Sequence, residues 1–417
     1  MITSPISRRE FLGHAAGSMT LLALAGAAEA KARPPRARIR ALTKGPLHHF
    51  FGYYGMSPWN RSGKKLICLE TTIKGRGPKP GEPAGVCVVD AATGNAERIT
   101  ETRAWNFQQG TMFYWNPLAP ETEVLFNDIH EGKPACVKLD ITTGKKTFLP
   151  MAIAGVGTTG RYALCLDYGR LIRVRPVVGY VGANDPFPND KHPDGDGVYR
   201  MDLATGETKL VLSLGEAFRR LEAARPEIRN RDLFFNHTVF NKSDTRFLVL
   251  ARTFTEKGQL ESGMFTATLE GSDLREVVPY GNAVSHFDWR NDREIIATYN
   301  VEGIKRHVLF TDGKKDHRVI GEKHLISDGH CVFGPDQNWI ATDRDNLPHT
   351  SKTLMLFNVA TGAYAELGEF QMGEMIHTRG EIRCDLHPRW KATGDQVCVD
   401  AFDAAGLRQL HIADIEF

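Results

Sequence analysis

The sequence predicts an all-β protein folded as a single seven-bladed β-propeller. A turn followed by an apolar strand recurs seven times, for example in "GKKLICLE" (from 63) and "DTRFLVLA" (from 244). A strand that runs into a tight turn also recurs seven times, as in "VCVVDAATG" (from 86) and "LMLFNVATG" (from 354). Short strands with Gly, Asp and Asn turns at this spacing are typical of small antiparallel sheets repeated around an axis.

The first pattern is preceded by an aromatic residue in six of the seven units, at Trp59, Trp115, Phe240, Trp289, Phe333 and Trp390. The last strand, "LRQLHIADIEF", ends the chain without a following outer strand. We expect residues before His48 to provide that strand, which would close the ring and cover its edge.

The chain begins with a segment that resembles a twin-arginine export signal. Arg8 and Arg9 precede a short apolar stretch, and Ala28-Glu29-Ala30 matches a cleavage site, although an ordinary signal peptide is the alternative. We expect a signal over residues 1–30, a linker over 31–44 and the propeller over 45–417. The mature protein would then be periplasmic or secreted and have no membrane span, because the apolar stretch is too short to cross a bilayer.

Composition limits the partners and the fold. The 417 residues are 41% hydrophobic and 24% charged with a net charge of +2, so a cored protein is expected and nucleic acid is a poor partner. The seven cysteines form no close pair and are expected to be buried thiols. The one helical pattern after the signal, at 215–230, predicts a short inserted helix.

Four histidines occupy one position of the repeat. Each stands three residues before the aromatic residue of its unit: His237, His286, His330 and His387. Units one and two have Met56 and Met112 there, with four polar residues slightly upstream: His48, His49, Gln108 and Gln109. Equivalent positions of a propeller surround the channel at one height, so the four rings should meet in one pocket.

A single histidine at such a place is more often structural, but four in register favour a functional site. Neutral imidazole is a common metal ligand and a general base near pH 7. Asp385 lies on the same strand face as His387 and offers a carboxylate ligand. We expect a divalent metal, Mn²⁺ or Zn²⁺ before Ca²⁺, at His286, His330, His387 and Asp385.

The third unit carries a long insertion over residues 167–200 that is rich in arginine. Its candidate residues for binding an anionic substrate are Arg170, Arg175 and Tyr180, followed by Arg200. Planar guanidinium groups suit bidentate binding of a carboxylate. The alternative is a solvated loop with surface arginines.

In its "NHTVFN", "SHFDW" and "DLHPRW" segments the chain resembles oligogalacturonate lyases, propeller enzymes that cleave uronate glycans. The resemblance implies that His237 is the base, that Arg200 assists it, and that His286 and His387 hold a metal. The family's Gln-x-x-His-x-His run departs here, because Ile382 and Asp385 replace its glutamine and first histidine. His330 is expected to complete the metal set.

A second arrangement, in related uronate lyases, places a histidine pair and a tyrosine on the second and third blades. His130 and Tyr180 would fill it, although Gln109 stands where a partner histidine is wanted. Gln109, His48 and His130 are also expected to contact substrate. Removing the proton next to a uronate carboxylate needs a base and a positive charge to stabilise the enolate-like state. With His237 as the base, Arg200 and the metal are expected to hold the carboxylate, and Tyr180 or Arg175 is expected near the leaving oxygen.

The expected function is therefore metal-assisted β-elimination in a 4-linked, acidic oligo- or polysaccharide. Two other classes stay open. A metal-dependent glycan hydrolase would use the same ligands to activate water. A non-catalytic propeller scaffold of the TolB or WD40 kind would instead present an exposed apolar face.

Overall fold

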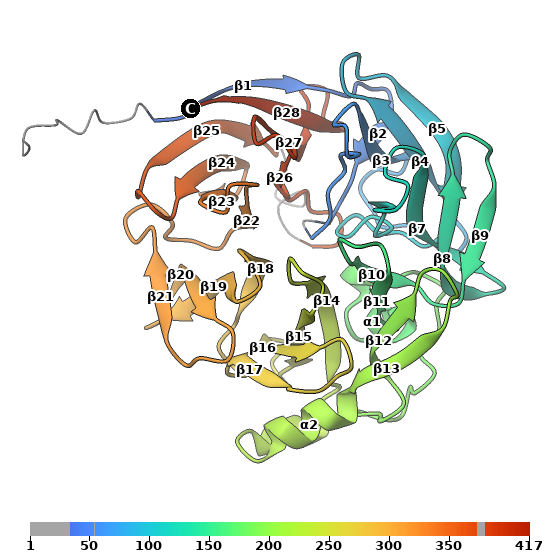
Figure 1. The fold of residues 1–417 in the computed structure, drawn as a ribbon, viewed down its shortest axis with the longest axis vertical. Coiled ribbons are helices and arrows are strands. Elements are labelled where there is room, and N and C mark those ends of the chain that lie inside the picture. The colour runs from blue at the N-terminus through green and yellow to red at the C-terminus, as the bar shows by residue number, and fades with distance from the viewer. Residues whose placement is uncertain (1–33, 54, 373–379) are drawn as a thin grey trace, which may run out of the picture. The chain divides into compact units, whose positions relative to one another are not determined.

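The computed structural model describes residues 34–53, 55–372 and 380–417, and their strands form seven four-stranded antiparallel sheets. Viewed down the axis, the sheets are arranged in a ring (Figure 1). The predicted seven-bladed propeller is confirmed. The expected signal over residues 1–30 lies outside the described part of the chain.

Blades 1 to 4 follow one another along the chain. Blade 1 contains β2 (His48–Phe50), β3 (Lys65–Thr71), β4 (Ala84–Asp90) and β5 (Ala96–Thr102). Blade 2 contains β6 (Tyr114–Trp115), β7 (Glu123–His130), β8 (Lys133–Asp140) and β9 (Lys146–Leu149). Blade 3 contains β10 (Ile153–Val156), β11 (Tyr162–Cys165), β12 (Gly197–Asp202) and β13 (Thr208–Ser213). Blade 4 contains β14 (Phe234–Phe240), β15 (Arg246–Phe254), β16 (Leu260–Thr268) and β17 (Arg275–Val278).

Blades 5 and 6 repeat this order, and blade 7 joins the two ends of the described chain. Blade 5 contains β18 (Ser285–Trp289), β19 (Glu294–Val301), β20 (Ile304–Thr311) and β21 (His317–Ile320). Blade 6 contains β22 (Val332–Phe333), β23 (Trp339–Asn346), β24 (Ser351–Asn358) and β25 (Tyr364–Gln371). Blade 7 contains β26 (Arg389–Trp390), β27 (Gln396–Phe402), β28 (Arg408–Glu416) and β1 (Arg36–Ala41).

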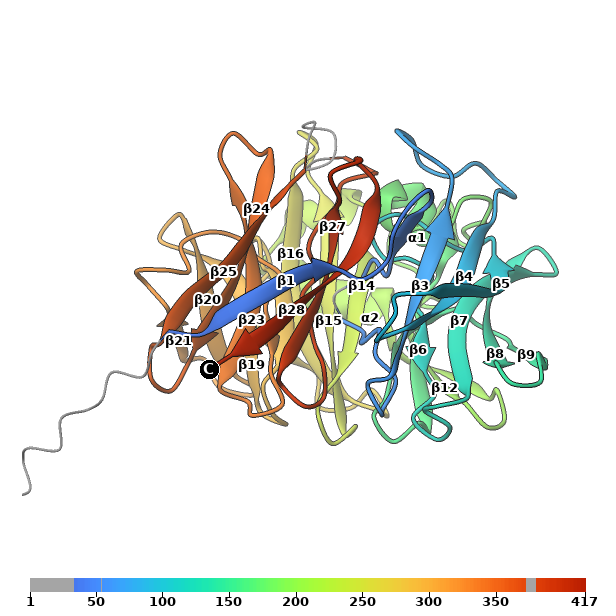
Figure 2. The same ribbon diagram turned by 90° about the horizontal axis from the view of Figure 1, so that it is seen from above.

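The ring closes through β1, which pairs antiparallel with β28 from Arg36 opposite Glu416 to Ala41 opposite His411. Figure 2 shows the two strands side by side. The expected closure by residues before His48 is therefore confirmed. The expected linker at 31–44, however, contains this strand, because the outer edge of β28 would otherwise be left unpaired.

The recurring tight turn has a simple cause, seen after β4. The Asp90 carboxylate accepts hydrogen bonds from the backbone N–H groups of Ala92 and Thr93 and from the Thr93 hydroxyl. Gly94 then takes a φ of +76°, and a Cβ there would lie 1.9 Å from the Leu42 carbonyl oxygen. An Asp at the start and a Gly at the end are what this turn requires.

The aromatic residues before each strand repeat interlock neighbouring blades. The Trp115 indole N–H donates to the Pro58 carbonyl, that of Trp289 to Val239 and that of Trp390 to Val332. Each acceptor belongs to the preceding blade or the segment that leads into it, so the indole rings join sheets as well as filling the core.

Two α-helices occur in the described residues, both attached to blade 3. The expected helix at 215–230 is α2 (Leu214–Glu222), followed by the 3₁₀ helix η2 (Pro226–Asn230), which begins at a proline. The other, α1 (Tyr168–Val174), was not expected from the pattern and leads into the 3₁₀ helix η1 (Pro176–Val178). Asp167 caps α1 by accepting from the N–H groups of Gly169 and Arg170.

The seven cysteines are all buried and free, as expected. No helix of the described chain is long and apolar enough to span a membrane.

Candidate active site

The histidines of the repeat position lie on a bent segment of backbone at the start of the innermost strands. His237, His286 and His387 have positive φ values of 60°, 34° and 43°. The strand register shifts around His237 in β14 and around His286 in β18. Bulges of this kind redirect a side chain, and positive φ is uncommon outside glycine. The repeat therefore turns the imidazoles with the same backbone device in blades 4, 5 and 7.

Three of the four imidazoles gather beside Asp385. The rings of His286 and His330 have centroids 3.9 Å apart, and those of His330 and His387 are 4.6 Å apart. One ligand atom each from His330, Asp385 and His387 lies within 4.8 Å of the other two. Two imidazoles and a carboxylate form a donor set that suits Mn²⁺ or Zn²⁺, with His286 next to it.

Carboxylates behind two of the imidazoles fix their orientation. His330 Nδ1 lies 2.9 Å from both oxygens of Asp343, and His286 Nδ1 lies 2.8 Å from Asp328 Oδ1. When Nδ1 donates to a carboxylate, the lone pair of a neutral imidazole lies on Nε2, the nitrogen that would then ligate a metal. Sequence reasoning identified His330 and His286 but not these two supporting aspartates.

The Asp385 carboxylate is held ionised by the basic groups around it. Its Oδ2 lies 2.7 Å from Arg383 Nε and its Oδ1 lies 3.2 Å from Lys352 Nζ. Burial by itself would raise the pKa of Asp385, but Arg383, Lys352, His330 and His387 together hold that pKa well below its usual range. A cation bound here would share the carboxylate with these two side chains, which lowers the gain from binding it.

His237 lies apart from this group and has the properties of a neutral base. Its ring stacks on Tyr53 with centroids 5.1 Å apart, and its Nδ1 lies 3.2 Å from the Gln109 amide. Burial lowers the pKa of His237 well below its usual value, and the charges of Arg252 and Arg175 lower it further. The ring is therefore neutral at pH 7. The Gln109 amide nitrogen, 3.2 Å from Nδ1, holds the plane of this neutral ring.

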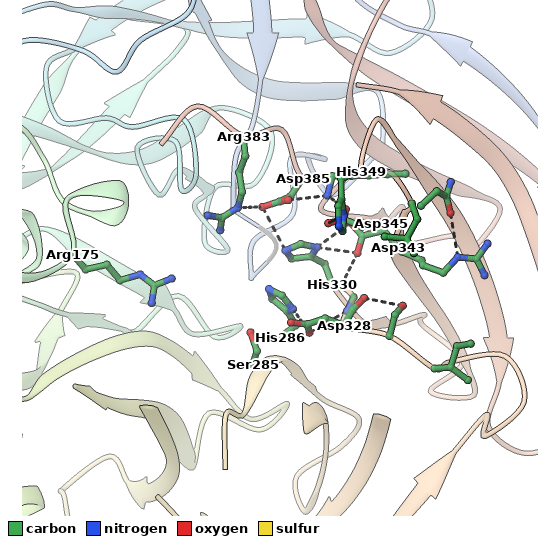
Figure 3. Close-up of a pocket in the computed structure, with 17 residues that line it drawn as sticks. Arg175, Ser285, His286, Asp328, His330, Asp343, Asp345, His349, Arg383 and Asp385 are labelled. Atoms are coloured by element: carbon green, nitrogen blue, oxygen red, sulfur yellow. Dashed lines mark hydrogen bonds and ion pairs between the residues drawn. The ribbon is translucent and has the colours of Figure 1, made fainter. Parts of the chain in front are cut away.

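A cavity of about 860 Å³ opens beside the imidazoles, and Arg175 lines it. Arg175 is the C-cap of α1, and its Nε and Nη1 atoms are buried without a hydrogen-bond partner in the described chain. Burial, together with Arg252 and Arg383, lowers the pKa of Arg175. Figure 3 shows its guanidinium group facing His286 and His330 across the cavity. A buried cation without a partner is costly, so this group suits an anionic ligand.

The structure places several expected site residues away from this cavity. Arg200, on β12, pairs with Glu270 at 2.8 Å and stacks on Tyr162, because the third strand of a blade lies outside the channel. Tyr180 is fully buried, with its hydroxyl 2.9 Å from Asn127 Nδ2 and its ring stacked on Tyr168. The expected roles of Arg200 beside the base and of Tyr180 near the leaving oxygen are therefore corrected.

Three further residues that were expected to contact substrate do not line this cavity, and neither do the expected base His237 and the expected ligand His387. Arg170 is buried and donates to the carbonyls of Leu233, Asp190 and Lys191, so it holds the insertion together. His130 lies at the end of β7 and stacks on Phe148. His48 accepts a hydrogen bond from the Arg408 backbone N–H and faces a separate, smaller cavity. Gln109 is also not in contact with the large cavity, but it orients His237.

The sequence reasoning missed the residues that surround the imidazoles: Asp328, Asp343, Lys352, Arg383 and Arg252. Only one of them had a visible signal. Arg383 stands two residues before Asp385, which puts both side chains on one face of an extended segment. The others come from second or third strands or from loops.

Comparisons with known proteins support the fold. No family model and no curated protein matches the chain. An oligogalacturonate lyase from Vibrio parahaemolyticus matches with a TM-score of 0.61 and 11% identity, over 91% of this chain and 93% of that one. A structure of oligogalacturonate lyase in complex with manganese matches with a TM-score of 0.64 and 14% identity, over 91% and 93%.

Propellers with other activities match as well. A puromycin-hydrolysing peptidase of Mycobacterium tuberculosis has a TM-score of 0.53 and 11% identity, over 88% of this chain and 56% of that one. Identities this low show a shared fold alone. The chemistry therefore has to be argued from the site.

Proposed function

We propose that the protein is a lyase that cleaves a 4-linked uronic-acid oligo- or polysaccharide by β-elimination. One observation carries the proposal: Arg175, whose Nε and Nη1 have no partner among the described residues, lines one cavity with His330 and Asp385 of the metal-type donor set, and the neutral His237 is close enough to feel the charges of Arg175, His286 and His330. These are the base, the carboxylate partner and the source of positive charge that such an elimination requires. The lyase fold of two structural neighbours agrees with it.

In this proposal Arg175 binds the uronate carboxylate, whereas the sequence resemblance implied that Arg200 assists the base. The guanidinium group offers two parallel N–H donors, and its buried position strengthens the pairing. It also withdraws charge from the carbon next to the carboxylate, which makes the C5 proton more acidic.

His237 takes that proton. The C5–H bond breaks, a C4–C5 double bond forms, and the bond from C4 to the leaving oxygen breaks, after which this oxygen takes up a proton. A ring that is neutral at pH 7 needs no prior loss of a proton, and Gln109 and Tyr53 hold its plane. A divalent cation held by His330, Asp385 and His387 would add positive charge that stabilises the enolate-like state.

The test is to incubate purified protein, with and without added Mn²⁺, with oligomers of different uronic acids. A lyase produces the ultraviolet absorbance of an unsaturated uronate. New reducing ends without that absorbance would assign the protein to the glycan hydrolases instead. If no uronate glycan yields either product, the enzymatic proposal fails and a scaffold is favoured.

A further inference from the structure

The large cavity has two ends of different chemical character. Arg175 and Arg383 form what we call the cationic end, and Figure 3 shows both on one side of His286 and His330. On the other side of these imidazoles Figure 3 shows Asp328 and Asp345. Ile326 and Leu347, each two residues from one of these aspartates, also line the cavity. We call these four residues the acidic–apolar end.

The charges at the acidic–apolar end are already compensated. Asp328 pairs with His286 at 2.8 Å and lies 3.8 Å from Lys305, and Asp345 pairs with Lys352. Arg344, which lines the same end, pairs with Glu366 at 3.0 Å. The other basic group lining this part of the described cavity, His349, also faces a carboxylate, with its Nδ1 3.9 Å from Asp345. Each of these basic groups therefore already has a counter-charge.

The cationic end differs because it contains donor N–H groups that no described residue uses, and an anionic ligand needs such groups. The Arg383 guanidinium is shared with Asp385, whereas Nε and Nη1 of Arg175 have no partner within the described residues. A metal ion at Asp385 would add positive charge at this same end and would increase the difference. Among the described residues that line the cavity, those of the cationic end therefore stabilise a ligand carboxylate best.

The apolar side chains at the other end are unusually accessible. Leu347 is 82% exposed and Ile326 is 53% exposed, and both contact the same cavity. Exposed aliphatic groups at the mouth of a polar cavity favour a ligand with an apolar face. The C–H face of a neutral sugar ring meets this condition, and a cavity of about 860 Å³ holds more than one sugar.

We propose that the sugar joined to the bound uronate is neutral, so that the substrate is a mixed glycan of a uronate and an uncharged sugar rather than a polyuronate. The uronate carboxylate lies at Arg175, and the neutral ring lies against Ile326 and Leu347. This inference rests on the proposed function for its uronate, but it concerns binding and can be tested without turnover.

Calorimetric titration of the His237→Gln variant with two disaccharides tests it, since this variant should not consume them. One disaccharide is glucose 4-linked to glucuronate, and the other is glucuronate 4-linked to glucuronate; the matching galacturonate pair is run in parallel. We expect the neutral-sugar disaccharide to bind about tenfold more tightly. Equal or tighter binding of the di-uronate, or no binding of either pair, would overturn the proposal.

Leu347→Lys provides the second arm, because it adds a cation at the acidic–apolar end on a residue that is too exposed to affect folding. The preference for the neutral sugar should fall by roughly fivefold or more. Leu118→Lys is the matched control, since Leu118 is 71% exposed and does not line the cavity. An unchanged preference in Leu347→Lys would contradict the assignment. If His237→Gln prefers the neutral-sugar disaccharide but the parent protein yields no unsaturated product from any uronate glycan, only the proposed function fails and the binding proposal stands.

Discussion

In blades 4 to 7 the residue three before the inner aromatic is histidine, whereas in blades 1 and 2 it is methionine. Met112 has a φ of 51°, close to the 60° of His237, so the same backbone turn occurs in both halves of the ring. Met56 and Met112 are 3% and 1% exposed and belong to the hydrophobic core. His286 and His330 instead line the large cavity.

This difference separates two contributions: the fold sets the position and direction of the residue, and the side chain decides whether the position is packed or polar. The repeat points one residue per blade inward, and an apolar residue there closes the channel by packing. An imidazole with a carboxylate behind it leaves a polar surface and an adjacent cavity. The two halves can therefore be tested against each other, position by position.

The largest expected effect is at His237. His237→Gln should lower kcat by about 10²–10⁴-fold, because general-base catalysis contributes that much, with little effect on the unfolding midpoint. Steady-state kinetics and thermal melts check this, and Met112→Leu at the equivalent position should leave kcat unchanged. Near-normal activity in His237→Gln, with His130→Ala or Tyr180→Phe inactive, would move the base to the second and third blades.

The next largest effects are expected at Arg170 and Arg175, five residues apart in the insertion. Changing one should affect stability, and changing the other should affect substrate affinity. Arg175→Met should raise KM by roughly thirtyfold or more, because losing a buried charge partner costs about 2 kcal/mol or more in binding. Stability should be unchanged or higher, since the change removes a buried cation whose Nε and Nη1 have no partner among the described residues.

Arg170→Met should show the opposite result, losing stability because three carbonyl oxygens lose their donor. Its KM should stay close to that of the parent if the fold is retained. Denaturant titration and initial rates measure both variants. If Arg175→Met leaves KM unaltered, Arg175 does not bind the carboxylate.

A smaller effect, on metal affinity, is expected from changing the carboxylate that supports His330. Asp343→Asn should weaken Mn²⁺ binding by about 10–100-fold, because the carboxylate that orients His330 loses its charge. Equilibrium dialysis measures this directly, and Asp140→Asn, in an exposed turn on blade 2, is the control. Equal affinity in Asp343→Asn and the parent would argue against His330 as a ligand.

The smallest effect is the pH response of the base. The pKa of His237 is lowered well below the usual 6.5, so the ring is already neutral above that pH. Ionisation of His237 should therefore cause no change in kcat/KM above pH 6.5. It should lower kcat/KM only as the pH drops through the lowered pKa, where the ring becomes protonated. A pH–rate profile whose acidic limb has its midpoint above 6.5 would contradict this assignment.

Much of the fold was predictable because the repeat depends on residues that act locally, within a turn or between neighbouring strands. Asp90 and Gly94 are required by the turn itself, and Trp289 is required by the neighbouring blade. The same logic found the four histidines, since one backbone position recurs. It predicted a closing strand before His48 but placed residues 36–41 in a linker, because this polar sequence forms β1 only where β28 offers an edge.

The site was less predictable because its supporting residues come from positions that do not repeat. Asp343 lies on a second strand, and it meets His330 through pairing within blade 6. Arg200 and Arg175 were both plausible from the sequence of the insertion. What separates them is α1, a seven-residue helix without a strong apolar pattern, which ends at Arg175 beside the cavity.

Closure through β1 and β28 also dictates when this cavity comes into existence. The strand nearest the start of the described chain pairs with the one nearest its end, so blade 7 cannot be completed until β28 has left the ribosome. Contacts between such distant segments form late and slowly. Arg175 and Asp385 stand on different blades of the closed ring. Nascent chains that carry only the earlier blades therefore lack part of the lining of this cavity, which is completed when blade 7 closes.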